Sequence, residues 1–81
     1  MFLHIGQEES ILMKDIVAII DIKAEKTSVY TREFLRTAAE EGFVKGEPEK
    51  PKSFVVTNNR IYLSPISAST LKKRVSDFLN L

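Results

Sequence analysis

The chain has 81 residues, of which 43% are hydrophobic and 28% charged, and it contains no cysteine. This composition is that of a single small globular domain spanning residues 1–81, and it excludes a disulfide framework and a thiolate metal site. The formal net charge of +1 conceals a polarity, because residues 1–49 carry six basic and ten acidic side chains whereas residues 50–81 carry six basic and one acidic.

The first third of the chain has the pattern of β-strands. Residues 2–5 predict a short strand that ends at Gly6, and residues 11–13 begin a second strand that Lys14-Asp15 interrupts. Residues 16–22 are the strongest strand candidate because they begin with five consecutive apolar residues, four of them β-branched. Such a run is typical of a strand that is covered on both faces, here by a helix or a neighbouring subunit.

Residues 28–41 predict a helix. Thr27 or Ser28 supplies the capping oxygen, and Gly42 stands where a left-handed residue ends helices. Apolar side chains recur at helical spacing and predict the buried stripe. That stripe consists of Tyr30, Phe34 and Ala38, widened by Leu35 and Ala39.

The second half predicts a hairpin followed by a helix. Residues 46–51 form a loop, and the segments 53–57 and 60–63 flank Asn58-Asn59, a pair suited to a type I′ turn. Ser64-Pro65 ends the second strand, and Ser67 or Ser69 caps a helix that runs to about Leu79 with Leu71, Val75, Phe78 and Leu79 on its apolar side. The predicted fold is therefore a small α+β domain with a sheet of about four to five mostly antiparallel strands and two helices.

The chain has few residues of the types that usually form catalytic or metal sites. His4 is the only histidine, and no cysteine is available to complete a zinc site with it. The carboxylate pairs Glu8-Glu9 and Glu40-Glu41 have no neighbouring base and are read as solvated residues. We therefore expect no enzymatic activity, no metal and no cofactor. The longest apolar run is too short to span a membrane, and the first residues lack the basic start of a signal peptide, so we expect a cytoplasmic location.

The most informative segment is basic and free of carboxylates. From Lys50 to Arg74 no acidic residue occurs, which is an electrostatic pattern suited to phosphate and makes nucleic acid the first partner to consider. A solvated face or a charged subunit interface would give the same pattern. The candidate phosphate-binding residues of this segment are Lys50, Lys52, Arg60, Lys72, Lys73 and Arg74.

Several motifs resemble a known family. They are Phe2-x-x-Ile5-Gly6, the segment Asp15–Asp21, the segment Pro51–Thr57, and above all Ser64-Pro65-Ile66-Ser67 before the helix that contains Thr70-Leu71-Lys72-Lys73-Arg74. Together they resemble the bacterial extracellular-matrix regulatory proteins, the RemA/RemB family, and the RemB branch in particular. The resemblance covers nearly the whole chain.

The resemblance implies a small cytoplasmic regulator of Gram-positive bacteria that binds double-stranded DNA and controls biofilm matrix genes. It also implies a ring-like homo-oligomer in which basic residues repeat around the assembly. From the residues themselves we expect neither a metal nor a membrane partner. Lys14-Asp15 stands where the RemA branch has an adjacent arginine pair, so Lys14 joins the candidate DNA-binding residues. Lys50 and Lys52 occupy the region of that branch's second basic cluster, although a lysine lacks the bidentate fork of arginine.

Two other functions compete with this hypothesis. In the first, the chain is a protein–protein assembly module that binds no DNA, and the basic half of one subunit docks on the acidic half of the next. Contacts of this kind are heterologous and can close into rings, so assembly and DNA binding are compatible. In the second, the chain binds RNA, which is poorly supported because the aromatic residues are assigned to the core.

Overall fold

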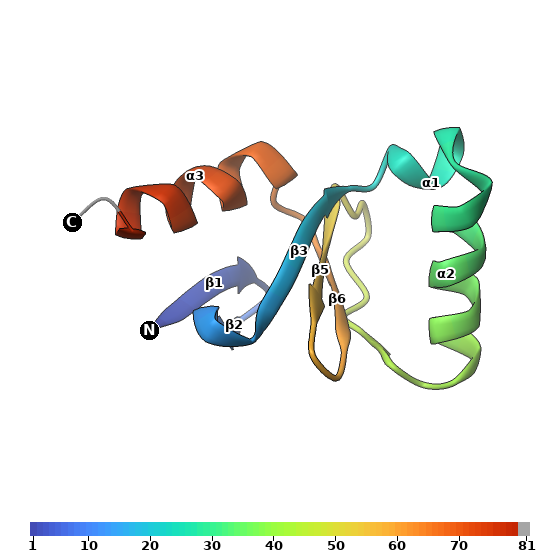
Figure 1. The fold of residues 1–81 in the computed structure, drawn as a ribbon, viewed down its shortest axis with the longest axis horizontal. Coiled ribbons are helices and arrows are strands. Elements are labelled where there is room, and N and C mark those ends of the chain that lie inside the picture. The colour runs from blue at the N-terminus through green and yellow to red at the C-terminus, as the bar shows by residue number, and fades with distance from the viewer. Residues whose placement is uncertain (80–81) are drawn as a thin grey trace.

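The computed structural model describes residues 1–79 and has an α+β fold (Figure 1), as the sequence predicts. Its strands are β1 (Phe2–Gly6), β2 (Glu9–Leu12), β3 (Ile16–Asp21), β4 (Val44–Lys45), β5 (Ser53–Thr57) and β6 (Ile61–Ser64). Its helices are the short 3-10 turn η1 (Met13–Asp15), α1 (Ala24–Thr27), α2 (Val29–Glu40) and α3 (Ala68–Leu79). The one-turn helix α1 was not predicted, whereas α2 and α3 lie where the apolar periodicity places them.

Within residues 1–79 the strands form two sheets. β1 and β2 pair as an antiparallel hairpin, and the other four strands form a sheet in the order β3-β5-β6-β4. β5 pairs antiparallel with both β3 and β6, and only the short β4 runs parallel to its neighbour β6. The four-stranded sheet stands in the centre, with α2 on one side and the β1–β2 hairpin and α3 on the other (Figure 1).

The two core clusters meet at β5, because successive residues of a strand point to opposite faces. Val55 packs with Leu3, Ile5, Ile11 and Leu71 on the side of α3 and the β1–β2 hairpin. Phe54 packs with Ala38 and Ile61 on the side of α2. β5 is therefore the strand that is covered on both faces. This packing fixes the position of the hairpin that β5 forms with β6, which is basic because Lys50, Lys52 and Arg60 flank its strands.

Within the single chain the apolar run at residues 16–22 is not covered on both faces, so cover by a neighbouring subunit stays a prediction. β3 lies at an edge of the sheet, and Val17 is 69% exposed. The apolar run identified a strand correctly, but a run of this kind does not distinguish a central strand from an edge strand that another surface covers.

The predicted capping residues are confirmed at both long helices. The Ser28 Oγ accepts from Thr31 N at 3.2 Å at the start of α2, and the Ser67 Oγ accepts from Thr70 N at 3.2 Å at the start of α3. At the end of α2, Gly42 has a φ of 81° and Phe43 N donates to Ala38 O at 2.9 Å, which is the pairing of a Schellman motif.

The hairpin at Asn58-Asn59 is confirmed, but its predicted type I′ turn is wrong. Neither asparagine has a positive φ, and the non-glycine residues of the described chain that do are Gln7 and Glu8 in the β1–β2 turn. At the β5–β6 turn the Thr57 side chain bonds to both backbone groups of Arg60, in place of a strand-to-strand backbone bond. Its Oγ1 accepts from Arg60 N at 3.0 Å and donates to Arg60 O at 2.9 Å. This side-chain bridge allows a tight turn without left-handed residues.

The face of α2 that packs against the sheet contains only part of the predicted buried stripe. Ala38 is buried and Leu35 partly buried, as predicted, but Tyr30 is 88% exposed and Phe34 is 48% exposed. The apolar residues of this helix cover more of its circumference than the sheet can bury. One aromatic face of α2 therefore remains in solvent.

Two serines fasten the layers together. Ser53 and Ser64 are opposite each other in the β5–β6 ladder, and both are fully buried. The Ser64 Oγ donates to Ile5 O at 2.6 Å and accepts from Ile66 N at 3.0 Å, while the Ser53 Oγ donates to Ile66 O at 2.7 Å. These bonds join the β1–β2 hairpin and the segment leading to α3 to the centre of the main sheet.

We expect Ser64→Ala to lower the free energy of unfolding by about 1–3 kcal/mol, because a buried carbonyl and a partly buried amide lose their partner. Urea unfolding followed by circular dichroism measures this change. Ser10→Ala, at an exposed position of β2, is the matched control and should stay within about 0.5 kcal/mol of the parent. Equal effects of the two substitutions would contradict a fastening role for Ser64.

Candidate nucleic-acid interface

The candidate basic residues lie in three separate places rather than in one patch. The first is the tip of the β5–β6 hairpin, where Arg60 directly precedes β6. Lys14 in η1 belongs to this end of the sheet, because the next residue, Asp15, accepts a backbone hydrogen bond from Asn58 N at 3.2 Å. Lys14 is exposed and Arg60 is half-buried. The Asp15 side chain adds a negative charge to this end and lowers its attraction for phosphate.

The second place is the base of the same hairpin. Lys52 is held by its backbone, which donates to Ser64 O at 2.8 Å and accepts from Ile22 N at 3.0 Å. Both Lys50 and Lys52 are exposed, and the partly buried Pro51 between them anchors the segment. Because β5 has five residues, roughly 17 Å separates this basic pair from the hairpin tip.

The third place is α3, where three consecutive basic residues point in different directions. Lys72 lines a groove beside β3, and the Arg74 Nη1 donates to His4 O at 3.2 Å. The Lys73 Nζ lies 3.3 Å from a carboxylate oxygen of Asp77 in an exposed ion pair. All three side chains are exposed, but α3 does not present them to a single ligand surface.

His4 takes a structural position. Its side chain is on the exposed face of β1, and its backbone carbonyl accepts the bond from Arg74. In the described part of the chain, no group of three or more histidine, cysteine or carboxylate side chains is close enough together to hold a metal ion.

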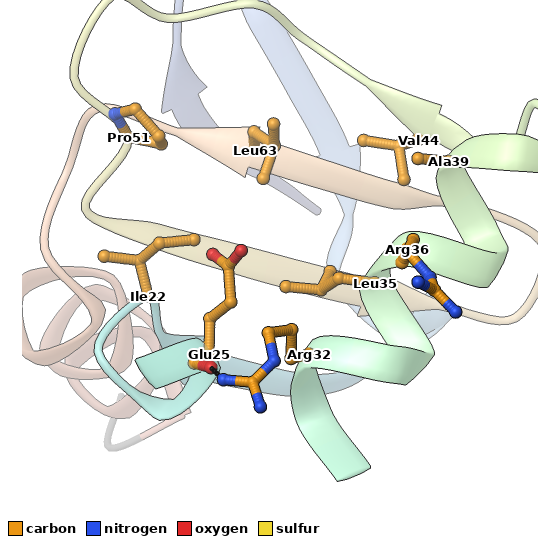
Figure 2. A pocket seen from close by; sticks show the side chains of 9 residues that line it. All are labelled: Ile22, Glu25, Arg32, Leu35, Arg36, Ala39, Val44, Pro51 and Leu63. Carbon is orange, nitrogen blue, oxygen red and sulfur yellow. Dashed lines mark hydrogen bonds between the residues drawn. The ribbon is translucent and has the colours of Figure 1, made fainter. Parts of the chain in front are cut away.

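A mainly apolar cleft of about 360 Å³ separates α2 from the sheet (Figure 2). Its base is formed by apolar side chains of α2, the sheet and the loop before β5: Ile22, Leu35, Ala39, Val44, Pro51 and Leu63. At the rim, Glu25 projects over the cleft, and the Arg32 Nη1 donates to the Glu25 carbonyl oxygen at 3.5 Å. The Arg36 guanidinium is engaged with Glu33 at 2.8 Å and lies 3.9 Å from Glu40.

A second groove follows the free edge of the main sheet. It lies between β3 and α3 and is lined by Ile16–Ile19, Lys72, Val75, Ser76 and Leu79. Val17 and Leu79 expose most of their apolar surface there. An uncovered strand edge beside an apolar groove is a surface that another chain can cover.

The sequence reasoning missed the exposed aromatic residues. Tyr30 and Phe34 on α2 were assigned to the core, and Phe43, which is 50% exposed, was not singled out. A signal was available, because the apolar positions of α2 span more than one helical face and cannot all be buried against one sheet.

The α+β fold with its β5–β6 hairpin and C-terminal helix spans the region that a single family model matches. The sequence model of the RemA-like family, described as "Extracellular matrix regulatory protein A-like", matches residues 2–75, and the chain belongs to this family. Over 74 residues it is 42% identical to "Extracellular matrix regulatory protein B" of Bacillus subtilis (strain 168), covering 91% of this chain and 89% of the relative. This likeness confirms the predicted RemB branch. Among residues 1–79, no helix is both long and apolar enough to cross a membrane.

The Arg74 contact predicts unequal roles for neighbouring basic residues. Arg74→Ala should lower the free energy of unfolding by about 1 kcal/mol, because the His4 carbonyl loses a charged donor. Lys73→Ala removes only an exposed ion pair and should cost about 0.5 kcal/mol or less. Chemical denaturation of both variants tests this, and a larger loss for Lys73→Ala would contradict the assignment of Arg74 to the β1–α3 contact.

Proposed function

We propose that the chain is a DNA-binding regulator of extracellular-matrix genes that acts in the cytoplasm as a homo-oligomer. The observation that carries this proposal is the β5–β6 hairpin, which is rigid and has basic residues at both ends. No carboxylate occurs in the segment from Lys50 to Ser76. Phosphate contacts of this kind give binding that depends strongly on salt and weakly on base sequence.

The proposal assigns no catalytic role to the chain. Its family is described as regulatory, and the candidate residues are suited to binding phosphate rather than to proton transfer or nucleophilic attack. Lys14, Lys50, Lys52 and Arg60 are the residues expected to contribute most. Lys72, Lys73 and Arg74 are expected to contribute less, because their side chains diverge around α3.

The separation of the basic residues supports assembly as part of this proposal. One subunit can place only a few of them on a duplex at once, so its binding is weak. Several linked subunits convert each further contact into an intramolecular step and raise the overall affinity by orders of magnitude. We propose that the free edge of β3 and the groove beside α3 form one side of the subunit contact, in a ring-like assembly.

Charge reversal at the hairpin base tests the DNA contact. The double substitution Lys50→Glu and Lys52→Glu should weaken binding to a duplex by about tenfold or more, since two attractive contacts become repulsive. The backbone bonds of Lys52 do not depend on its side chain, so the fold should persist. Fluorescence anisotropy of a labelled duplex of a few tens of base pairs measures the affinity.

The matched control is Lys23→Glu with Lys26→Glu, which changes the net charge equally at two exposed lysines of the acidic half. Duplex affinity should fall much less in this control. An equal loss in the two double variants would mean that only overall charge matters. Absence of binding by the parent chain at low salt would favour the competing function, a protein–protein assembly module.

The assembly surface has its own test. Val17→Glu places a charge on the free edge of β3 and should shift the chain toward monomer, which light scattering after size-exclusion chromatography measures directly. Val29→Glu is the control, because Val29 is also exposed but lies on α2. An unchanged mass for Val17→Glu, or an equal loss in both variants, would contradict this placement of the contact.

A further inference from the structure

The exposed aromatic residues of α2 and the loop after it border a hollow of which the duplex-binding proposal uses only Arg60. This hollow has a volume of about 410 Å³ and lies between α2 and the tip of the β5–β6 hairpin. Phe34 and Phe43 line it on one side, and Asn58, Asn59 and Arg60 line it on the other. Its size falls within the range of about 300–1,000 Å³ that is usual for small-ligand sites.

We propose that this hollow binds a nucleotide, with the base against the phenylalanine rings and the phosphate at Arg60. Half-exposed aromatic rings provide faces on which any base can stack. Asparagine amides offer a donor and an acceptor that match the hydrogen-bonding edges of bases. A guanidinium presents a fork of donors that matches a phosphate. Together, these three chemical groups fit a nucleotide.

The walls of the hollow are held in place before any ligand arrives. Phe43 is fixed on both sides, because its backbone nitrogen donates to Ala38 O at 2.9 Å and its carbonyl accepts from Ile61 N at 2.9 Å. The hairpin tip is held by the Thr57 side chain, whose Oγ1 also lies 3.3 Å from the Asn59 Oδ1. A site on such elements loses little conformational entropy when it binds.

The charge of the hollow also favours a nucleotide. The ion pairs found within residues 1–79 engage Arg36 and Lys73, so the Arg60 guanidinium takes part in none of them. Among the described residues that line the hollow, none carries a carboxylate. Asp15 contacts the rim of the hollow through its backbone carbonyl, which accepts from Asn58 N at 3.2 Å.

The nucleotide could be free or could be an unpaired residue of a single strand, and the same chemistry would recognise both. The inference shares Arg60 with the duplex-binding proposal but is tested at other residues: duplex binding at Lys50 and Lys52, at the other end of the hairpin, and nucleotide binding at Phe43. Failure of one proposal therefore leaves the other standing.

The test is a nuclear magnetic resonance titration of the isotope-labelled full chain with AMP, with single-stranded hexadeoxyadenylate and with inorganic phosphate. AMP or the single strand should shift the side-chain amide signals of Asn58 and Asn59 and the ring signals of Phe34 and Phe43. Tighter binding of the single strand than of AMP at these signals identifies an unpaired base as the source, and equal affinities identify the free nucleotide.

Phe43→Leu removes one stacking face and keeps the site apolar, and it should weaken binding about tenfold. Tyr30→Leu is the matched control, because Tyr30 is an exposed aromatic residue of α2 outside the hollow, and it should leave the affinity unchanged. Duplex affinity should be unchanged in Phe43→Leu. If that variant does not keep the parent spectrum, Asn58→Asp supplies the test, because its new charge should repel the phosphate and weaken binding.

Three results would overturn the proposal. The first is the absence of shifts at these residues with millimolar AMP and with the single strand. The second is an equal response to inorganic phosphate alone, which would indicate only a simple anion contact at Arg60. The third is an equal loss of affinity in Phe43→Leu and Tyr30→Leu.

Discussion

The arrangement of the whole molecule depends on the buried hydrogen bonds of Ser53 and Ser64. Both serines are fully buried, where an unpartnered polar group would be costly, and each finds its partner in a segment outside the main sheet. Ser64 reaches Ile5, which is 59 positions away in the sequence. The N-terminal hairpin and the start of α3 are thereby fixed against the same two strands that carry the basic residues.

This constraint explains why the hairpin can serve as a binding element. β5 is buried on both faces, β6 is bonded to it along its length, and the ends of the pair are tied by Thr57 and by the backbone of Lys52. The basic side chains at the two ends are therefore spaced by a strand of fixed length. A ligand with regularly spaced charges, such as a duplex, can match that spacing when several subunits present it together.

The sequence predicted most of this framework from local signals. The capping serines, the terminating Gly42 and the hairpin around Asn58-Asn59 are short-range patterns, and each lies where it was expected. The resemblance to the extracellular-matrix regulatory family is confirmed by the comparisons. The candidate basic residues were identified as a set, but their distribution over three places depends on the tertiary fold.

The errors have a common physical cause. The strand at residues 16–22 and the stripe of Tyr30 and Phe34 are as apolar as core segments, yet both expose apolar surface in the single chain. The hydrophobic pattern of a sequence indicates that a surface is suited to burial, but it does not indicate which part of the chain or which partner covers that surface. For β3 we propose a second subunit, and for the aromatic side of α2 a nucleotide.

The central claim is that duplex binding uses phosphate contacts from several assembled subunits. The most direct test is the dependence of duplex affinity on salt concentration, compared between the parent chain and the association-deficient Val17→Glu variant. In a plot of the logarithm of duplex affinity against the logarithm of salt concentration, the account predicts a steep slope for the parent, which corresponds to more phosphate contacts than one subunit can make. It predicts a much shallower slope for the variant. A parent slope near zero, or equal slopes for the two proteins despite a change in mass, would contradict it.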